Sequence, residues 1–276
     1  MKKFADLFSD LDQTTKTNAK VDALVEYFNT ANEDDAIWAV ALLTGRKPKR
    51  TVKTAELKTW AIELSGVSDW IFEESYHVVG DLAETITLLL PKSESFTEYG
   101  LSAMMALLKS LSTKTEEERK HIIQEIWMQL NTEERFVFNK LITGSFRVGV
   151  SQQLVIKALA KNFSVPESSV AYQLMGNWTA EDTSLQHLLF NTSIEEDASK
   201  PYPFYLAYQL DIPMEALGTI ADGQIEYKFD GIRGQIIVRK NELFVWSRGE
   251  ELMTDKFPEF EILKLALPDG TVIDGE

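Results

Sequence analysis

The sequence contains no cysteine and only three histidines in 276 residues. Without cysteine the chain has no disulfide, no thiolate zinc site and no cysteine nucleophile. This composition fits a reducing compartment, and we expect a cytoplasmic location. The histidines are far apart and form no H-E-x-x-H pattern, so a histidine metal site is not expected. They are His77, His121 and His187.

Long apolar runs are also absent. No stretch approaches the ~18 consecutive apolar residues that a membrane-spanning helix needs, so no membrane partner is expected. The first residues, MKKFADLFSD, contain a basic pair but are followed by no apolar segment, which argues against a signal peptide. We expect a soluble protein. With 44% hydrophobic residues, the chain can bury a sizeable core and is long enough for one large domain or two.

Positive charge is scarce overall but concentrated in one segment. The net charge of −15 by itself argues against nucleic acid, because phosphate binding depends largely on Lys and Arg. The segment TGRKPKRTVK at residues 44–53, however, holds five cations and no acid. Taken alone, it could equally be a solvated basic loop. Its candidate DNA contacts are Arg46, Lys47, Lys49 and Arg50.

Apolar residues recur at helical spacing from the N-terminus to about residue 190. Three segments open on Asn, Thr or Ser and close on Gly, as helices do: NEDDAIWAVALLTG, TAELKTWAIELSG and SDWIFEESYHVVG. Asn131 and Ser151 begin two similar units, and Pro166 marks a further helix start. The pattern predicts about eight to ten helices and no strand here. The six tryptophans fall mostly on apolar helical faces, so we expect them in the core.

The pattern changes near residues 200–203, where two prolines in four residues disfavour helix and mark a linker. Beyond it, QIEYKFD, GQIIVRK and ELFVWSR are rich in β-branched and aromatic residues and predict strands, with a hairpin turn at Lys240 and Asn241. FPEFEILKLAL predicts a helix and TVIDGE another strand. The fold class is therefore multi-domain, α and α+β. An all-α domain at residues 1–205 precedes the beginning of an antiparallel α+β domain at 206–276, which we expect to be incomplete.

The segment EYKFDGIRGQ carries the candidate chemistry. In a strand, side chains alternate, so Glu226, Lys228 and Asp230 are expected on one face while Tyr227 and Phe229 pack on the other. A surface hairpin with scattered charges is the plain alternative. On the motif alone, the two interpretations are about equally favoured.

A lysine in this position can serve as a nucleophile. Gly231 permits a sharp turn, after which Arg233 can return toward Lys228. Like charge and burial lower the pKa of an amine, whereas neighbouring carboxylates raise it. An amine that loses its proton near neutral pH attacks an activated phosphorus or carbonyl carbon.

Two further motifs follow at short separations: SRGEE at residues 247–251 and VIDGE at 272–276. The order K-x-D-G-x-R, S-R, D-G-E resembles the first nucleotidyltransferase motifs of ATP-dependent DNA ligases. In that family the lysine attacks the α-phosphorus of ATP, releases pyrophosphate and becomes a lysine–AMP phosphoramidate. The AMP passes to the 5′-phosphate of a nick, and the 3′-hydroxyl then displaces it and seals the strand.

The resemblance implies a role for each matching residue. Lys228 would be the adenylated nucleophile, and Glu226 would read the adenine amino group. Arg233 would contact the nucleotide sugar, and Arg248 the phosphate of AMP or of the nick. Glu276 would contact the ribose or help to place a metal ion.

The resemblance also implies cofactors and a partner. Asp230 would be a supporting residue that orients the lysine or the turn. ATP and Mg²⁺, or another divalent cation, would be the cofactors, because phosphoryl transfer relies on positioning and charge neutralisation. Nicked double-stranded DNA would be the partner, and we expect a monomer.

Two helical stretches, LLTGRKPKR and GSFRVGVSQQLVIKALA, resemble the helical DNA-binding domain that precedes the catalytic core of such ligases. Residues 143–151 form a glycine-bounded loop before a helix N-terminus, which favours phosphate, and Arg147 adds a charge. The plain alternative is that both glycines only end helices. Together with the basic segment and the ligase motifs, phosphate binding is the favoured interpretation. Such contacts position DNA without reading its sequence.

The later motifs of the family do not follow Glu276: an aromatic that stacks on adenine, an E-G segment, a K-x-K segment and a C-terminal OB-fold. We therefore expect an N-terminal portion of a longer ligase that is weakly active or inactive alone. The alternatives are a non-catalytic DNA-binding module, an RNA ligase or a capping guanylyltransferase. The long helical domain argues against the last two, and NAD-dependent ligases differ in their N-terminal region.

Overall fold

The computed structural model of the chain describes residues 1–276 apart from 48, 94–95, 145, 147, 176–177, 191–197, 205–211, 220, 222, 224–226, 228 and 250. The chain divides into two compact units. Unit 1 comprises Met1–Glu167 and Trp178–Leu188, and unit 2 comprises Ser168–Asn177 and Leu189–Glu276. The predicted domain boundary, between residues 205 and 206, lies outside the described residues and stays a prediction.

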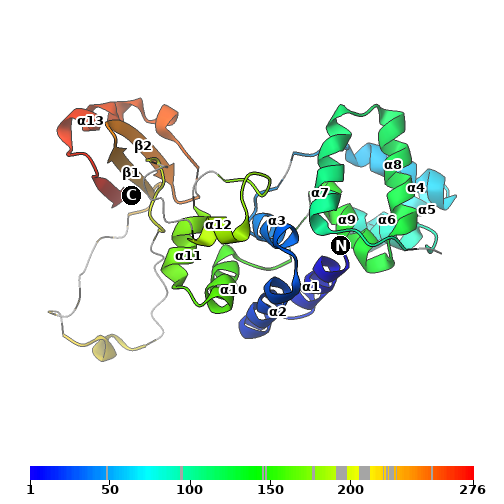
Figure 1. Cartoon of the computed structure of the whole chain (residues 1–276), viewed down its shortest axis with the longest axis horizontal. Coiled ribbons are helices and arrows are strands. Elements are labelled where there is room, and N and C mark those ends of the chain that lie inside the picture. Colours follow the sequence, from blue (N-terminus) through cyan, green and yellow to red (C-terminus); the bar gives the residue numbers. More distant parts are fainter. Residues whose placement is uncertain are drawn as a thin grey trace. The chain divides into compact units, whose positions relative to one another are not determined.

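The N-terminal region is helical, as predicted (Figure 1). Up to residue 190 its described helices, in chain order, are α1 (Lys2–Asp12), α2 (Thr17–Thr30), α3 (Glu33–Leu43), α4 (Thr54–Ser65), α5 (Asp69–Val79), α6 (Leu82–Leu89), α7 (Leu101–Ser110), the 3-10 turn η1 (Leu111–Thr113), α8 (Glu116–Gln129), α9 (Thr132–Thr143), α10 (Gln152–Phe163), α11 (Glu167–Leu174) and α12 (Leu185–Phe190).

The number of helices exceeds the prediction. Up to residue 190 the described residues form twelve α-helices, not eight to ten. Three of them, α6, α11 and α12, are only eight, eight and six residues long, too short for a helical period to be recognised. The predicted ends are confirmed at Gly66, Gly80 and Gly144, whose φ angles of 70°, 77° and 67° lie in the left-handed region that glycine adopts without strain.

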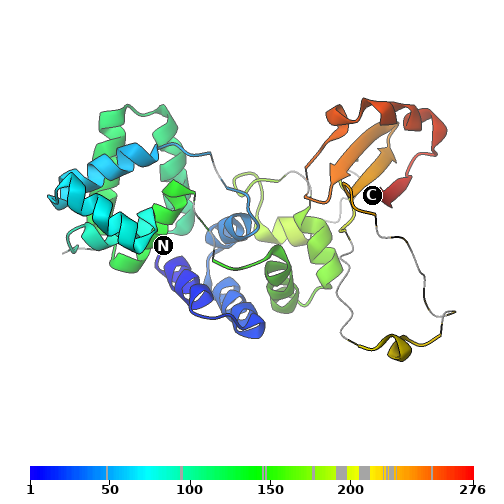
Figure 2. The ribbon, with the colours of Figure 1, turned by 180° about the vertical axis from the view of Figure 1, so that it is seen from behind.

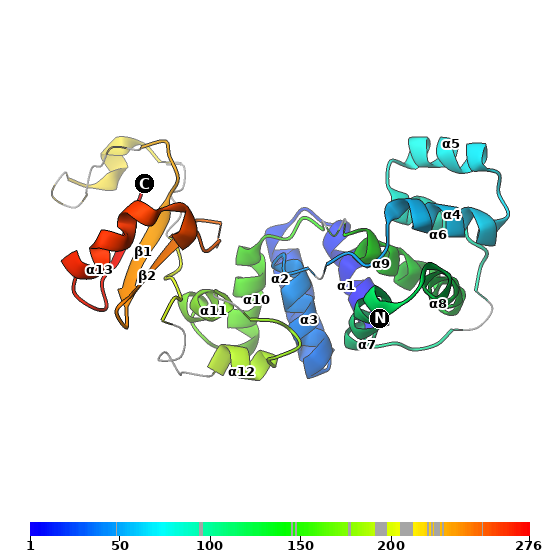
Figure 3. The ribbon, with the colours of Figure 1, turned by 90° about the horizontal axis from the view of Figure 1, so that it is seen from above.

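Packing in unit 1 places α2 against α10 and α1, and α1 in turn against α9. Figure 3 shows α6 between the outer helix α5 and helix α9, in agreement with the contacts of α6 to both. The rings of Phe4 and Phe8, on α1, lie 5.6 and 5.2 Å from the ring of Phe146. The segment that follows α9 is therefore anchored in the core through Phe146.

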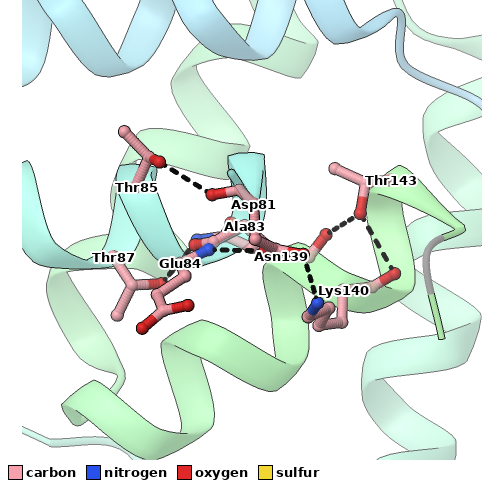
Figure 4. A network of polar contacts seen from close by, with 8 residues as sticks. All are labelled: Asp81, Ala83, Glu84, Thr85, Thr87, Asn139, Lys140 and Thr143. Atoms are coloured by element: carbon pink, nitrogen blue, oxygen red, sulfur yellow. Dashed lines mark hydrogen bonds and ion pairs between the residues drawn. The ribbon is translucent and has the colours of Figure 1, made fainter. Parts of the chain in front are cut away.

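A buried polar network joins α6 to α9 (Figure 4). Asn139 is fully buried, and its amide nitrogen donates to Thr87 Oγ1 at 3.1 Å and to the Ala83 carbonyl at 3.4 Å. Its side-chain oxygen accepts a hydrogen bond of 2.7 Å from Trp127 Nε1. Because each amide atom has a partner, the burial of Asn139 is not penalised, and the relative position of the helices is specified.

The ion pair between Lys140 and Asp81 joins the same two helices at the start of α6 (Figure 4). Asp81 also caps α6 by accepting a 3.0 Å hydrogen bond from the Glu84 N–H. Burial alone would raise the pKa of Asp81, but the hydrogen bonds from Lys140 and from the backbone outweigh it and hold the pKa below its usual value. These contacts fix the position of α9 relative to α6.

Unit 2 contains a small antiparallel sheet of the order β2-β1-β3 among the described residues. Its strands are β1 (Gly234–Arg239), β2 (Glu242–Ser247) and β3 (Val272–Gly275). The predicted hairpin turn is confirmed: Lys240 and Asn241 have φ angles of 52° and 60°, as a two-residue type I′ turn requires.

One face of the sheet is covered by the segment that was predicted to be helical. This segment forms the 3-10 helix η5 (Pro258–Ile262) and the single α-turn α13 (Leu263–Ala266), seen beside the strands in Figure 2. Val238, Leu243 and Val245 are buried here, and Phe257 and Phe260 pack on them. Each fully buried side chain of this size contributes about 1.5–3 kcal/mol. This cluster is the core of the sheet.

The expected packing of the first strand, QIEYKFD, is wrong for its described residues. Tyr227, Phe229 and Asp230 belong to no strand, and Tyr227 and Phe229 are 91% and 69% exposed. A strand needs a hydrogen-bonding neighbour, and β1 pairs with β2 and β3, so the described residues Tyr227, Phe229 and Asp230 do not pair with β1. Residues 224–226 and 228 lie outside the described part.

Candidate functional site

Three predicted nucleotide contacts meet at one end of the sheet. Gly234 on β1 stands opposite Ser247 on β2 and Gly275 on β3. The adjoining residues of these strands are Arg233, Arg248 and Glu276, so they lie at the same end. The Arg248 N–H donates a 2.9 Å hydrogen bond to the Arg233 carbonyl and continues the pairing by one residue.

The Arg233 side chain forms a two-point ion pair with Asp274. Its Nε lies 2.9 Å from Asp274 Oδ1 and its Nη2 3.2 Å from Oδ2. The hydrogen bond that Arg233 donates to Asp274 raises the pKa of Arg233, which therefore stays charged. Asp274 was not among the residues predicted from the sequence. The alternation of side chains along a strand could have identified it. Asp274 pairs with Gln235, so its side chain faces the same side of the sheet as that of Arg233.

Glu276 is fixed by the turn before β1. The Gly231 N–H donates a 3.0 Å hydrogen bond to Glu276 Oε1. No group of three or more His, Asp or Glu residues that could hold a metal ion occurs among the described residues. Mg²⁺ binds through one or two protein carboxylates together with phosphate oxygens and water, so Glu276 fits such a role, whereas Asp274 is engaged by Arg233. Asp230 is exposed beside this turn.

An apolar pocket of about 280 Å³ lies on the sheet face next to this end. Gly234 forms part of its floor, and a Cβ there would lie 2.8 Å from the Trp246 carbonyl oxygen. This position therefore admits only glycine without a shift of the backbone. The pocket is lined further by Ile236, Val245, Phe257 and Phe260, with Ser247 and Glu276 as polar members.

Three predicted site residues fall outside the described part of the chain. They are Lys228, the predicted nucleophile, Glu226 and Arg147. Their roles stay predictions.

The second candidate site lies in unit 1, where the structure brings two predicted DNA-contact segments together. The Lys47 Nζ donates a 3.2 Å hydrogen bond to the Gly144 carbonyl. The Arg50 side chain covers Gly144 so closely that a Cβ there would lie 3.0 Å from the Arg50 Nε. We call Arg46, Lys47, Lys49, Arg50, Gly144, Phe146 and residues 148–151 the basic surface.

Lys20, on α2, contacts the basic surface through its buried amine. It was not among the site residues predicted from the sequence. It is only 7% exposed, and its Nζ donates to the Gly149 carbonyl at 2.8 Å and to the Val148 carbonyl at 3.3 Å. The available signal was its spacing: Lys20 precedes Leu24 and Phe28 by four and eight residues, on the buried face of α2. Ser151 occupies the N-cap of α10 as predicted, but its side chain makes no capping hydrogen bond.

One chain thus combines a helical unit that carries a clustered basic surface with a sheet at one end of which two arginines and a glutamate meet. Residues 1–160 match the family described as DNA ligase N terminus. Because this match covers more than half of the chain, the chain belongs to that family.

Curated relatives agree with this assignment at low identity. The chain is 25% identical to a probable DNA ligase of Koribacter versatilis, over 95% of this chain and 47% of the relative. It is 24% identical to a DNA ligase of Thermoplasma volcanium, over 98% and 50%. It is 26% identical to a DNA ligase of Methanospirillum hungatei, over 86% and 42%. The chain thus spans about half the length of the curated relatives it matches.

The described helices include no candidate for a membrane span. None of them combines the length and the apolar character that crossing a bilayer requires.

Proposed function

We propose that this chain supplies the DNA-binding part and the first nucleotide-binding elements of an ATP-dependent DNA ligase. The observation that carries the proposal is the meeting of Arg233, Arg248 and Glu276 at one end of β1, directly after the lysine motif. In this proposal residues 1–205 hold nicked duplex DNA and residues 206–276 begin the adenylation domain.

The first step is nucleotidyl transfer to Lys228. The lone pair of its uncharged Nζ forms a bond to the α-phosphorus of ATP, the bond from that phosphorus to the bridging oxygen breaks, and pyrophosphate leaves. The nitrogen loses its remaining extra proton to water. Arg248 would stabilise the negative charge that develops on the phosphate oxygens, and the neighbouring Arg233, which is paired with Asp274, would contact the nucleotide sugar.

Two further transfers complete the reaction. An oxygen of the 5′-phosphate at the nick attacks the AMP phosphorus, the bond from that phosphorus to the Lys228 nitrogen breaks, and the nitrogen takes up a proton from water as it leaves. The 3′-hydroxyl then attacks the 5′-phosphate, loses its proton and releases AMP, which seals the strand. Glu226 would recognise the adenine amino group, and Asp230 would support the turn.

A divalent cation would assist these steps by neutralising phosphate charge when bound. Glu276 is the residue of this chain that would hold Mg²⁺, together with phosphate oxygens and water. Its carboxylate is already fixed by the Gly231 N–H, and this fixed position supports the assignment.

The test uses the full-length protein, first freed of any bound adenylate. Lys228→Arg keeps the positive charge, but its side chain does not lose a proton near neutral pH, so we expect no AMP adduct by mass spectrometry and no nick sealing with ATP and Mg²⁺. Lys256→Arg, in the 3-10 turn η4 (Thr254–Lys256), is the matched control and should behave as the unsubstituted protein does. Sealing by Lys228→Arg at the normal rate overturns the proposal.

The 276-residue chain by itself should seal nicks weakly or not at all, because its described nucleotide contacts Arg248 and Glu276 are exposed to water. A ligation assay on nicked duplex measures this directly. Robust sealing by this polypeptide alone contradicts the expectation. Retained DNA binding without any adduct on Lys228, in chain and full-length protein alike, favours a non-catalytic DNA-binding module.

A further inference from the structure

A pocket in unit 1 brings tryptophans and cations together beside the basic surface. Its volume is about 580 Å³, within the range of about 300–1,000 Å³ that small-molecule sites occupy. The walls come from α3, the segment between α3 and α4, the end of α7 and residues 178–181. The side chains that matter here are Trp38, Arg46, Lys47, Lys49, Lys109 and Trp178.

The two tryptophans of this pocket are not core residues. Trp60 and Trp127 are 2% and 0% exposed, as the sequence predicted for its tryptophans, whereas Trp38 and Trp178 are only partly buried and line the cavity. The guanidinium of Arg46 lies 4.6 Å from the centroid of the Trp178 ring. This cation–π contact fixes a positive charge and a flat surface together in one wall.

The charge in the pocket is predominantly positive. Lys47 and Lys49 are exposed, and Lys109 is ion-paired with Glu181, which also lines the pocket. Four cations thus face one carboxylate. A purely apolar ligand would not match these charges, and a bare phosphate would make no use of the indole rings. The matching ligand is anionic and has a planar, apolar part.

We propose that this pocket binds one unstacked nucleotide of a DNA strand, with its base against the indoles of Trp38 and Trp178 and its phosphate near Lys47 and Lys49. An aromatic platform combined with cations holds a single-stranded nucleotide of any sequence, because every base has a π-face. The inference rests on the proposed function in one respect, namely that DNA is the ligand of unit 1.

The primary experiment changes the DNA rather than the protein. The intact 276-residue chain is titrated with a nicked duplex that carries one unpaired thymidine at the nick, and with the same duplex in which that nucleotide is abasic. Both ligands carry the same phosphates. We expect the abasic form to bind about fivefold or more weakly, since stacking of one base is lost. Equal affinities would mean that the pocket holds a phosphate only, and would overturn the proposal.

A variant then locates the effect. Trp178→Leu should abolish the difference between the two ligands, and far-UV circular dichroism reports whether the variant is folded. Trp70→Leu is the matched control, because Trp70 lies on α5, is 68% exposed and does not line the pocket. A base effect that survives Trp178→Leu, or that Trp70→Leu removes equally, overturns the proposal.

The outcomes of these binding experiments can be told apart from a failure of the proposed ligase function. If the full-length protein forms no adduct on Lys228 while the base effect persists, the ligase proposal fails and the pocket remains. If the chain binds none of these duplexes, DNA is not the ligand, and the pocket proposal is overturned too.

Discussion

The Nζ of Lys47 donates a 3.2 Å hydrogen bond to the carbonyl oxygen of Gly144, which lies 97 residues later in the chain. Each of the two segments was ambiguous alone, since a basic run can be a solvated loop and a glycine can simply end a helix. Their contact makes one basic surface, so a duplex that touches one segment can touch the other without further movement of the chain. This shared position strengthens the assignment of both to DNA.

Removal of two cations from the basic surface should weaken duplex binding. We expect Lys47→Ala with Lys49→Ala to lower the affinity for nicked duplex and to reduce the slope of log affinity against log salt by about 1–2, since each phosphate contact contributes about 0.9. Fluorescence anisotropy at several salt concentrations measures both. The matched control is Lys114→Ala with Lys120→Ala, which removes the same charge at the start of α8.

An equal loss of affinity in both double variants would mean that only net charge matters. In that case the basic surface would not be a specific DNA contact.

The local features of the fold were predictable from the sequence. Asn131 and Gly144 bound a helix where the pattern indicated, and Lys240 and Asn241 form the expected hairpin turn. These signals depend on residues within a few positions of one another, because caps and tight turns use local hydrogen bonds and particular φ angles.

The remaining features depend on contacts between distant segments. The burial of Lys20 is possible only because two carbonyl oxygens more than a hundred residues later accept hydrogen bonds from its Nζ. The pairing of Arg233 with Asp274 needs the register of β1 and β3, which no short motif specifies. Tyr227 and Phe229 have strand-forming character, but strand propensity does not specify a partner, and β1 pairs with β2 and β3 instead.

Loss of the Lys20 amine should loosen the basic surface. In Lys20→Met the carbonyls of Val148 and Gly149 lose a buried donor, which we expect to cost about 1–3 kcal/mol in the free energy of unfolding. Urea denaturation followed by far-UV circular dichroism measures it. Lys161→Met is the control, since Lys161 pairs with Asp22 on the surface and such pairs contribute about 0–1 kcal/mol. Equal losses of unfolding free energy in the two variants would show that the buried hydrogen bonds of Lys20 stabilise the fold no more than a surface ion pair does.

A methyl group at Gly234 should disturb the sheet of unit 2. Its Cβ would lie 2.8 Å from the Trp246 carbonyl oxygen, so Gly234→Ala must push β1 from β2, at a cost of about 1–3 kcal/mol. We expect faster amide hydrogen exchange in peptides covering residues 234–247, measured by mass spectrometry. Gly249→Ala, where the nearest atom is Ser247 Oγ at 3.6 Å, is the control. If amide hydrogen exchange in these peptides is unchanged in Gly234→Ala, the close approach of Gly234 to the Trp246 carbonyl oxygen is contradicted.

The ion pair of Asp81 with Lys140 should make stability depend on acidity. The folded-state pKa of Asp81 is lowered, so its contribution is fully present above the unfolded pKa of about 3.9 and is lost as the pH falls through the folded pKa. Asp81→Asn retains a capping side chain but not the charge. At pH 7 we expect it to lower the free energy of unfolding by about 1 kcal/mol, a modest value because Asp81 is partly exposed.

That difference from the unsubstituted chain should shrink as the pH falls below about 4, since the protonated carboxyl no longer pairs with Lys140. Urea denaturation at a series of pH values from 7 to 3 measures the trend. Glu26→Gln, on the exposed face of α2, removes one carboxylate that forms no ion pair among the described residues, and its effect should stay small throughout. An Asp81→Asn deficit that is constant, or that grows in acid, would show that the charge of Asp81 does not stabilise the junction of α6 and α9. The polar network around Asn139 would then hold that junction without help from the ion pair.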